Sequence, residues 1–172
     1  ALRLNEVNAQ FSQTLSWNDT TPTSSVFTVG GGAGTNDYTN RDGTNMIAYC
    51  FTEKKGYSKF GSYTGTGNAT NSPFLYTGFK PAWVMLKESS GTSDWSMYDN
   101  KREPFNVADS TLEANTSDTE AVVSGRPIDI LSNGFKLRGD SSFTNESGAS
   151  YIYMAFAENP FVTSTGIPTT AR

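Results

Sequence analysis

The stretch YIYMAFAE, residues 151–158, decides the fold class. Its apolar residues fall on both sides of an extended chain, with Tyr151, Tyr153 and Ala155 on one face and Ile152, Met154 and Phe156 on the other. A strand that is apolar on both faces is typical of a central strand, covered on both sides of its sheet. The stretch TNMIAYCFTE, residues 44–53, has the same pattern. The sequence therefore predicts two such central strands.

The two stretches belong to an internal repeat with a constant offset of 105 positions. The residues shared are Asn40, Gly43, Ile47, Phe51 and Glu53 in one copy and Asn145, Gly148, Ile152, Phe156 and Glu158 in the other. Chance would give about one identity in so short a window. Weaker matches continue upstream, pairing Ser24 and Phe27 with Ser132 and Phe135, and Leu2 and Asn5 with Leu112 and Asn115.

The repeat predicts the domain organisation, because residues 1–53 resemble the back half of a module whose complete copy follows. We expect one β-sandwich unit over residues 1–162, with a partial first repeat in 1–56 and a complete second repeat in 57–162. Residues 163–172 are then a C-terminal tail. A chain that opens within a repeat is also expected to be a piece of a longer modular protein. The strand edge left open by the missing half-module would invite self-association or docking on another protein.

Further short apolar runs predict strands over residues 25–30, 57–64, 74–79, 82–87, 95–99, 128–131 and 134–138. Turn residues separate these runs, and residues 108–121 offer at most one helical turn. Pro81 has no N–H to donate, so it is expected at the first residue of a strand or at an edge. This pattern predicts an all-β, antiparallel jelly-roll or concanavalin-like β-sandwich with two related halves. The predicted core consists of Phe27, Ile47, Tyr49, Phe51, Phe60, Phe79, Trp83, Met85, Phe135, Leu137, Ile152, Met154 and Phe156.

The composition excludes several classes of function. The net charge of −4 provides no basic stripe for nucleic acid. No apolar run is long enough to span a membrane, so membrane insertion is not expected. Histidine is absent, which excludes Ser–His–Asp and Cys–His catalysis and every His-ligated metal site within this chain. The single cysteine, Cys50, cannot form an intrachain disulfide and is expected to be a small buried apolar residue.

The densest polar and aromatic cluster is DWSMYDNKRE, residues 94–103. A sugar-binding patch needs a flat aromatic face and fixed polar groups for the hydroxyls. The residues of these types, and hence the candidate ligand-binding residues, are Trp95, Tyr98, Asp99, Asn100 and Arg102. A purely structural role is the alternative: Trp95 and Met97 would then face the core, Tyr98 would face outward, and Asp99 and Asn100 would start a turn.

Acidic residues suggest two further sites, both weaker. Asp140, Asn145 and Glu146, with Asp94 or Asp99, have the oxygen ligands that calcium prefers, but no EF-hand spacing accompanies them. We therefore predict no cofactor and no bound metal. Paired carboxylates for glycoside hydrolysis would have to come from Glu53, Asp99, Glu103 and Glu158. Glu53 and Glu158 occupy equivalent repeat positions, which favours a repeated structural role, so no catalytic residue is predicted.

Four phrases of the sequence resemble repeat modules in tail and other virion proteins of marine bacteriophages. They are GYSKFGSYTG at 56–65, YTGFKPAWVM at 76–85, DILSNGFKLR at 129–138 and YIYMAFAE at 151–158. The resemblance is strong from residue 24 to residue 162. Such modules occur in tandem and resemble concanavalin-like β-sandwiches. The resemblance supplies no catalytic or metal-binding residue for this chain.

The resemblance implies a non-enzymatic bacteriophage virion component at the virion surface, in the tail or the head. The first expectation is a tail-fibre or spike-type module that binds a host-surface glycan or protein. The alternative is a capsid decoration or other purely structural virion protein, and a glycan depolymerase is less favoured. The expected partners are the host ligand, other virion proteins and further copies of the chain.

Overall fold

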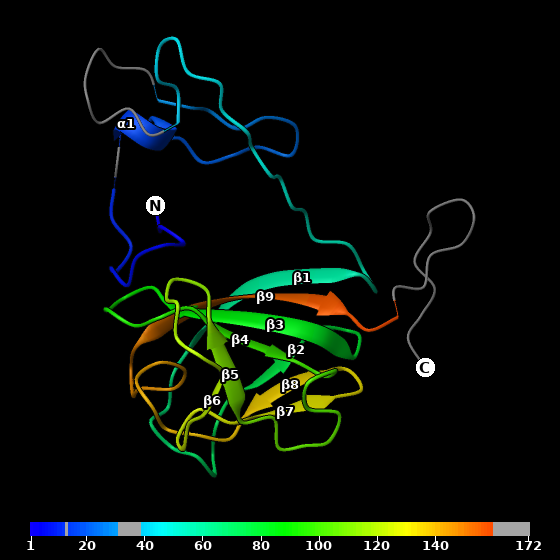
Figure 1. Cartoon of the computed structure of the whole chain (residues 1–172). Helices are drawn as coiled ribbons and strands as arrows, with labels where there is room; N and C mark the ends of the chain where they lie inside the picture. Colours follow the sequence, from blue (N-terminus) through cyan, green and yellow to red (C-terminus); the bar gives the residue numbers. More distant parts are fainter. Residues whose placement is uncertain (13, 31–38, 160–172) are drawn as a thin grey trace. The chain divides into compact units, whose positions relative to one another are not determined.

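The computed structural model describes residues 1–12, 14–30 and 39–159, which form two compact units. The amino-terminal unit consists of Ala1–Leu2 and Gln10–Phe51. The sandwich unit consists of Arg3–Ala9 and the chain from Thr52 onward. Only the sandwich unit contains strands among the described residues, and α1 (Thr14–Trp17) is the helix of the amino-terminal unit (Figure 1). In the described part of the chain, no helix has the length and apolar character needed to cross a bilayer.

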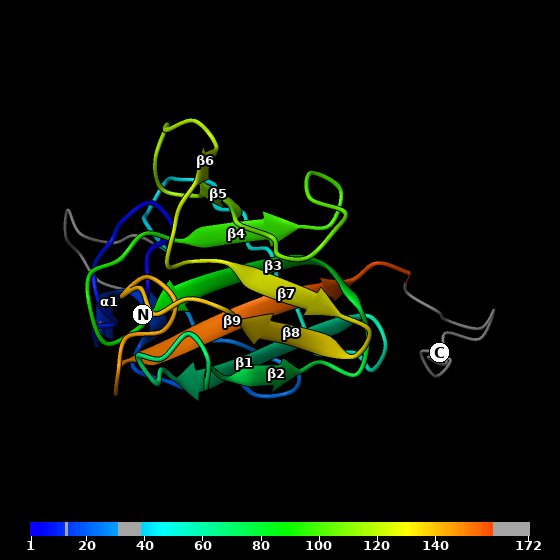
Figure 2. The same cartoon turned by 90° about the horizontal axis from the view of Figure 1, so that it is seen from below.

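The sandwich unit forms two antiparallel sheets from β1 (Ser58–Thr64), β2 (Phe74–Tyr76), β3 (Pro81–Glu88), β4 (Ser96–Asp99), β5 (Ser110–Glu113), β6 (Ala121–Val122), β7 (Ile128–Leu131), β8 (Gly134–Leu137) and β9 (Ser150–Ala157). The larger sheet has the order β1-β9-β3-β4-β5-β6, and the smaller sheet has the order β2-β8-β7. Figure 2 shows β7 and β8 lying across β3 and β9. The chain is therefore all-β, with two antiparallel sheets arranged as in a β-sandwich.

The apolar core lies between the two sheets. Tyr153 and Ala155 of β9 face it from the larger sheet, and Phe135 and Leu137 of β8 face it from the smaller one. The rings of Phe135 and Tyr153 meet edge to face, with centroids 5.4 Å apart. Residues of both sheets make one buried cluster because alternate side chains of each strand point to the same face.

The outer face of the larger sheet carries a second, partly exposed aromatic cluster around Phe156. The centroid of this ring lies 6.1 Å from that of Tyr57, 6.0 Å from Phe60 and 5.9 Å from Trp83. β9 is thus apolar on both faces, as its sequence predicts, and it is hydrogen-bonded on both edges by β1 and β3. The prediction of a central strand over residues 151–158 is confirmed.

Most of the other predicted strands are present as β1, β3, β4, β7 and β8, and a shortened β2 occupies part of 74–79. β3 begins at Pro81, as the missing N–H requires. β5 was not predicted, since Leu112 is its only apolar residue. The strand forms because Leu112 pairs with Met97 of β4. β6 pairs with β5 in turn.

Two predicted strands are wrong, because residues 25–30 and 44–53 form no strand. Ile47 and Tyr49 are both 81 % exposed, and Phe27 and Phe51 are exposed as well, so these four predicted core residues are corrected. Cys50 is also exposed rather than buried. The apolar alternation of 44–53 matches that of β9, but no neighbouring strand pairs with its backbone in the described chain.

The remaining predicted core residues are either buried or partly exposed. Phe79, Met85, Phe135 and Leu137 are buried. Those that are partly exposed are Phe60, Trp83, Ile152, Met154 and Phe156. The predicted tail over 163–172 lies outside the described residues.

Candidate functional site

The predicted site lies on β4 and on residues 100–109, the β4–β5 loop. The two rings nominated for stacking are buried. Trp95 donates its indole N–H to the carbonyl oxygen of Arg3 at 3.1 Å, and Tyr98 donates its hydroxyl to the carbonyl oxygen of Arg126 at 2.7 Å. Neither ring therefore offers an open face to a sugar.

The structural alternative for this segment also needs a correction. Ser96 and Tyr98 face the core, while Met97 lies on the outer side, which reverses the predicted alternation. Trp95 precedes β4, so its burial does not follow from the period of the strand. Its indole is held by the Arg3–Ala9 segment, which the sequence places far away.

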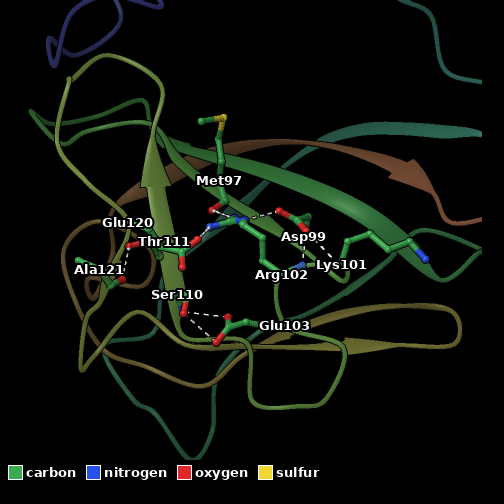
Figure 3. A network of polar contacts seen from close by, with 9 residues as sticks. All are labelled: Met97, Asp99, Lys101, Arg102, Glu103, Ser110, Thr111, Glu120 and Ala121. Carbon is green, nitrogen blue, oxygen red and sulfur yellow. Dashed lines mark hydrogen bonds and ion pairs between the residues drawn. The ribbon is translucent and has the colours of Figure 1, made fainter.

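Asp99 and Arg102 form a hydrogen-bonded network at the end of β4 (Figure 3). Asp99 accepts the backbone N–H groups of Lys101 and Arg102, each at 2.9 Å, so it closes the turn that follows the strand. The Arg102 guanidinium is paired with Asp99 and Glu120, and it also donates to the carbonyl oxygen of Met97 at 3.4 Å. Two of the nominated residues, Asp99 and Arg102, are thus brought together, with Glu120 as a partner that sequence spacing did not reveal.

Electrostatics keep this network ionised. Burial raises the pKa of the Asp99 carboxyl, but hydrogen bonds from Arg102 and Lys101 outweigh it, so the pKa lies below its ordinary value. Burial likewise lowers the pKa of Arg102, and hydrogen bonds to Asp99 and Glu120 outweigh it, so that pKa is raised. The Arg102 guanidinium forms ion pairs with Asp99 and Glu120, and these ion pairs stabilise the loop.

Asn100 lies inside the protein and does not present its amide to solvent. It is 95 % buried, its backbone N–H donates to the carbonyl oxygen of Ala82 at 3.0 Å, and its side-chain amide makes no hydrogen bond within the described residues. The neighbouring Lys101 is exposed, and its ammonium lies 3.5 Å from Glu158. Of the five predicted ligand-binding residues, Trp95, Tyr98 and Asn100 are therefore interior.

The rest of the β4–β5 loop is fixed by further polar contacts. Glu103 accepts the backbone N–H of Ser110 at 2.8 Å and its hydroxyl at 2.9 Å (Figure 3). Asn106 exchanges two hydrogen bonds with the backbone of Ile130, at 2.8 and 3.0 Å. Ala108 then pairs with Ile128 on β7. These bonds hold the loop against both sheets.

The braced loop presents one aromatic ring to solvent. Phe105 is 83 % exposed and lies between the two anchoring residues Glu103 and Asn106. Sequence analysis missed it because Pro104 and Phe105 follow the charged run without any strand pattern. A large apolar side chain in a polar turn is not expected to be a core residue, and this feature of the sequence could have identified Phe105 as exposed.

Two of the residues considered for calcium, Asn145 and Asp94, make hydrogen bonds within the protein. Asn145 is fully buried, and its side chain makes hydrogen bonds with Thr66, Asn68 and Gly139. Asp94 accepts a hydrogen bond from Asn115 at 2.6 Å. Among the residues that the structure describes, no three Asp, Glu or Cys side chains gather as metal ligands would.

The fold and this loop define a small all-β module with a braced surface loop. A family model described as a domain of unknown function, DUF7483, matches residues 1–160, so the chain belongs to that family. No curated protein and no solved structure matches the chain.

Proposed function

We propose that the protein is a non-enzymatic component of a bacteriophage virion, and that it binds a glycan or protein of the host surface as a tail-fibre or spike-type module. The four sequence phrases that resemble virion modules support the setting. The two antiparallel sheets support the finer assignment to a concanavalin-like or jelly-roll sandwich, and the proposal of two related halves rests on the internal sequence repeat. Such modules carry their ligand sites on loops that a rigid scaffold positions.

The exposed ring of Phe105 is the observation that supports binding. A solvent-exposed phenyl ring costs free energy unless a partner covers it, and aromatic side chains dominate the energy of many binding surfaces. The hydrogen bonds of Glu103 and Asn106 hold the surrounding backbone in place before any ligand arrives. A preorganised loop loses less entropy on binding than a mobile one.

The carboxylates support a role without catalysis. Glu53 is paired with Lys59, Glu158 with Lys80 and Lys101, and Asp99 with Arg102. The hydrogen bond from Lys80 is the main reason that the pKa of Glu158 lies below its ordinary value. A general acid for glycoside hydrolysis needs a raised pKa, and neither Asp99 nor Glu158 has one. We expect the protein to release no reducing ends from host polysaccharides.

The alternative is a capsid decoration or another purely structural virion role. The exposed apolar residues Met46, Ile47 and Tyr49 favour it, because such a stretch suits docking on another protein of the particle. In that case the protein would bind to virus particles and would not bind to host surfaces.

Binding of the full chain to an array of bacterial surface glycans and to intact bacterial cells tests the proposal. We expect Phe105→Ala to weaken binding about tenfold or more, since truncating an aromatic anchor costs on the order of 2 kcal/mol. Tyr76→Ala is the matched control, because Tyr76 is 64 % exposed but lies on β2.

Equal binding by Phe105→Ala and the parent chain would contradict the assignment of this loop. An absence of binding to every glycan and every cell, combined with binding to virus particles, would establish the alternative role instead.

A further inference from the structure

Both copies of the internal repeat contain the same turn, directly before β9 in one copy and before the equivalent residues in the other. Thr44 donates its backbone N–H to the carbonyl oxygen of Arg41 at 3.2 Å, and Ala149 donates to Glu146 at 3.2 Å. These residues correspond at the offset of 105. The glycines at the third position of each turn, Gly43 and Gly148, have φ values of 68° and 78°. This left-handed conformation favours glycine, so the repeat encodes the turn itself.

The correspondence extends upstream to the hairpin of the smaller sheet. Thr23 donates its backbone N–H to the carbonyl oxygen of Val26 at 2.9 Å. At the offset of 108 given by Ser24 and Ser132, these two residues correspond to Leu131 and Gly134, which pair across the turn between β7 and β8. Among its described residues, the amino-terminal unit therefore contains two turns of the β7–β9 region in the same order.

The two copies differ after the second turn. In the sandwich unit the chain continues as β9, which lies between β1 and β3 and pairs with both. In the amino-terminal unit it continues as residues 44–51, which we call the closing segment. The closing segment forms no strand, although Met46, Ile47 and Tyr49 occupy the positions of Tyr151, Ile152 and Met154.

Among the described residues, β1 and β3 are the strands that flank this position, and β9 occupies the place between them. The closing segment therefore needs a second pair of such strands to join a sheet in the same way as β9.

We propose that the closing segment is the last central strand of a second sandwich, and that it inserts between β1- and β3-type strands supplied by the front half of an equivalent module. The repeat indicates what this partner contains: short strands with alternating apolar side chains, like those of residues 58–99. Insertion would pair both backbone edges of the closing segment and bury its apolar side chains, as happens to β9. This inference is independent of the proposed function.

A fusion tests the inference. Residues 52–110 are joined ahead of Ala1, which supplies the residues of β1 to β4 in front of the amino-terminal unit. Amide hydrogen exchange is measured for residues 44–51 in the chain and in the fusion. We expect rapid exchange in the chain and exchange slowed about a hundredfold or more in the fusion, because strand hydrogen bonds protect amides. The thiol of Cys50, which is exposed in the chain, should also react more slowly in the fusion.

Two variants of the fusion serve as controls for the exchange experiment. Ile47→Asp in the fusion should restore rapid exchange at 44–51 and leave β9 protected. A second fusion carries residues 144–158 in place of 39–53, so that its first closing strand is the sequence of β9. Protection in this second fusion but not in the first would overturn the proposal, and so would a lack of protection in both.

Discussion

Residues 39–53 and 144–158 share much of their sequence, yet only the second stretch is part of a sheet. Asn145 is fully buried, and its side chain makes four hydrogen bonds, whereas Asn40 at the equivalent position is exposed. The partners of Asn145 include Thr66 and Asn68, which follow β1. The comparison shows that the local sequence encodes the turn and the two apolar faces, while strand formation requires neighbours from elsewhere in the module.

The two copies should differ most in how much stability is lost when Phe135 of β8, or its repeat counterpart Phe27, is replaced by alanine. Phe135→Ala should lower the free energy of unfolding by about 3–5 kcal/mol, since it leaves a cavity in a fully buried site. Phe27→Ala, at the equivalent position of the amino-terminal unit, should change it by less than about 0.5 kcal/mol. Urea unfolding followed by circular dichroism measures both. Equal losses would mean that the two copies are packed alike.

The next largest difference in lost stability is expected between Asn145, whose side-chain amide is buried, and its counterpart Asn40. Asn145→Ala removes four hydrogen bonds and leaves backbone groups of Thr66 and Gly139 without a partner, which should cost about 2–3 kcal/mol. Asn40→Ala should have little effect on urea unfolding, because its side chain is exposed. A small effect at Asn145 would show that water replaces the lost bonds.

The turn glycines should give a smaller difference. A Cβ added at Gly148 or Gly43 meets nothing within 4 Å, so the cost comes from the left-handed backbone alone. Gly148→Ala should destabilise the sandwich unit by about 1–2 kcal/mol. Gly43→Ala should leave the thermal midpoint of the sandwich unchanged in the present chain. In the fusion that supplies a second copy of β1 and β3, Gly43→Ala should become destabilising, which would sharpen the comparison.

The smallest expected difference lies in the pH dependence of stability and concerns Tyr151, whose repeat counterpart Met46 cannot ionise. Burial raises the pKa of Tyr151 to about 12 from 10.0. The folded state therefore binds the proton more tightly than the unfolded state, so stability is unaffected below about pH 10 and declines between about pH 10 and 12. Tyr151→Phe should make this decline shallower in unfolding experiments from pH 8 to 12. An unchanged pH profile would show that other tyrosines account for it.

The loop site could be predicted from sequence only in part. The charged residues Asp99 and Arg102 do come together, because a carboxylate that follows a strand readily caps the next turn. The burial of Trp95 depends on Arg3, and the second carboxylate partner of Arg102 is Glu120. Contacts across such separations have no periodic signal. The exposed Phe105 likewise depends on how the loop is anchored to β7.

The sequence by itself determined the all-β class, the turn positions and the two apolar faces of β9, because these follow from the period of two and from turn chemistry. The tertiary structure alone decided which of two similar stretches becomes a strand. A strand exists only where neighbours accept its backbone hydrogen bonds. Within the described chain β1 and β3 provide that position once, and β9 fills it.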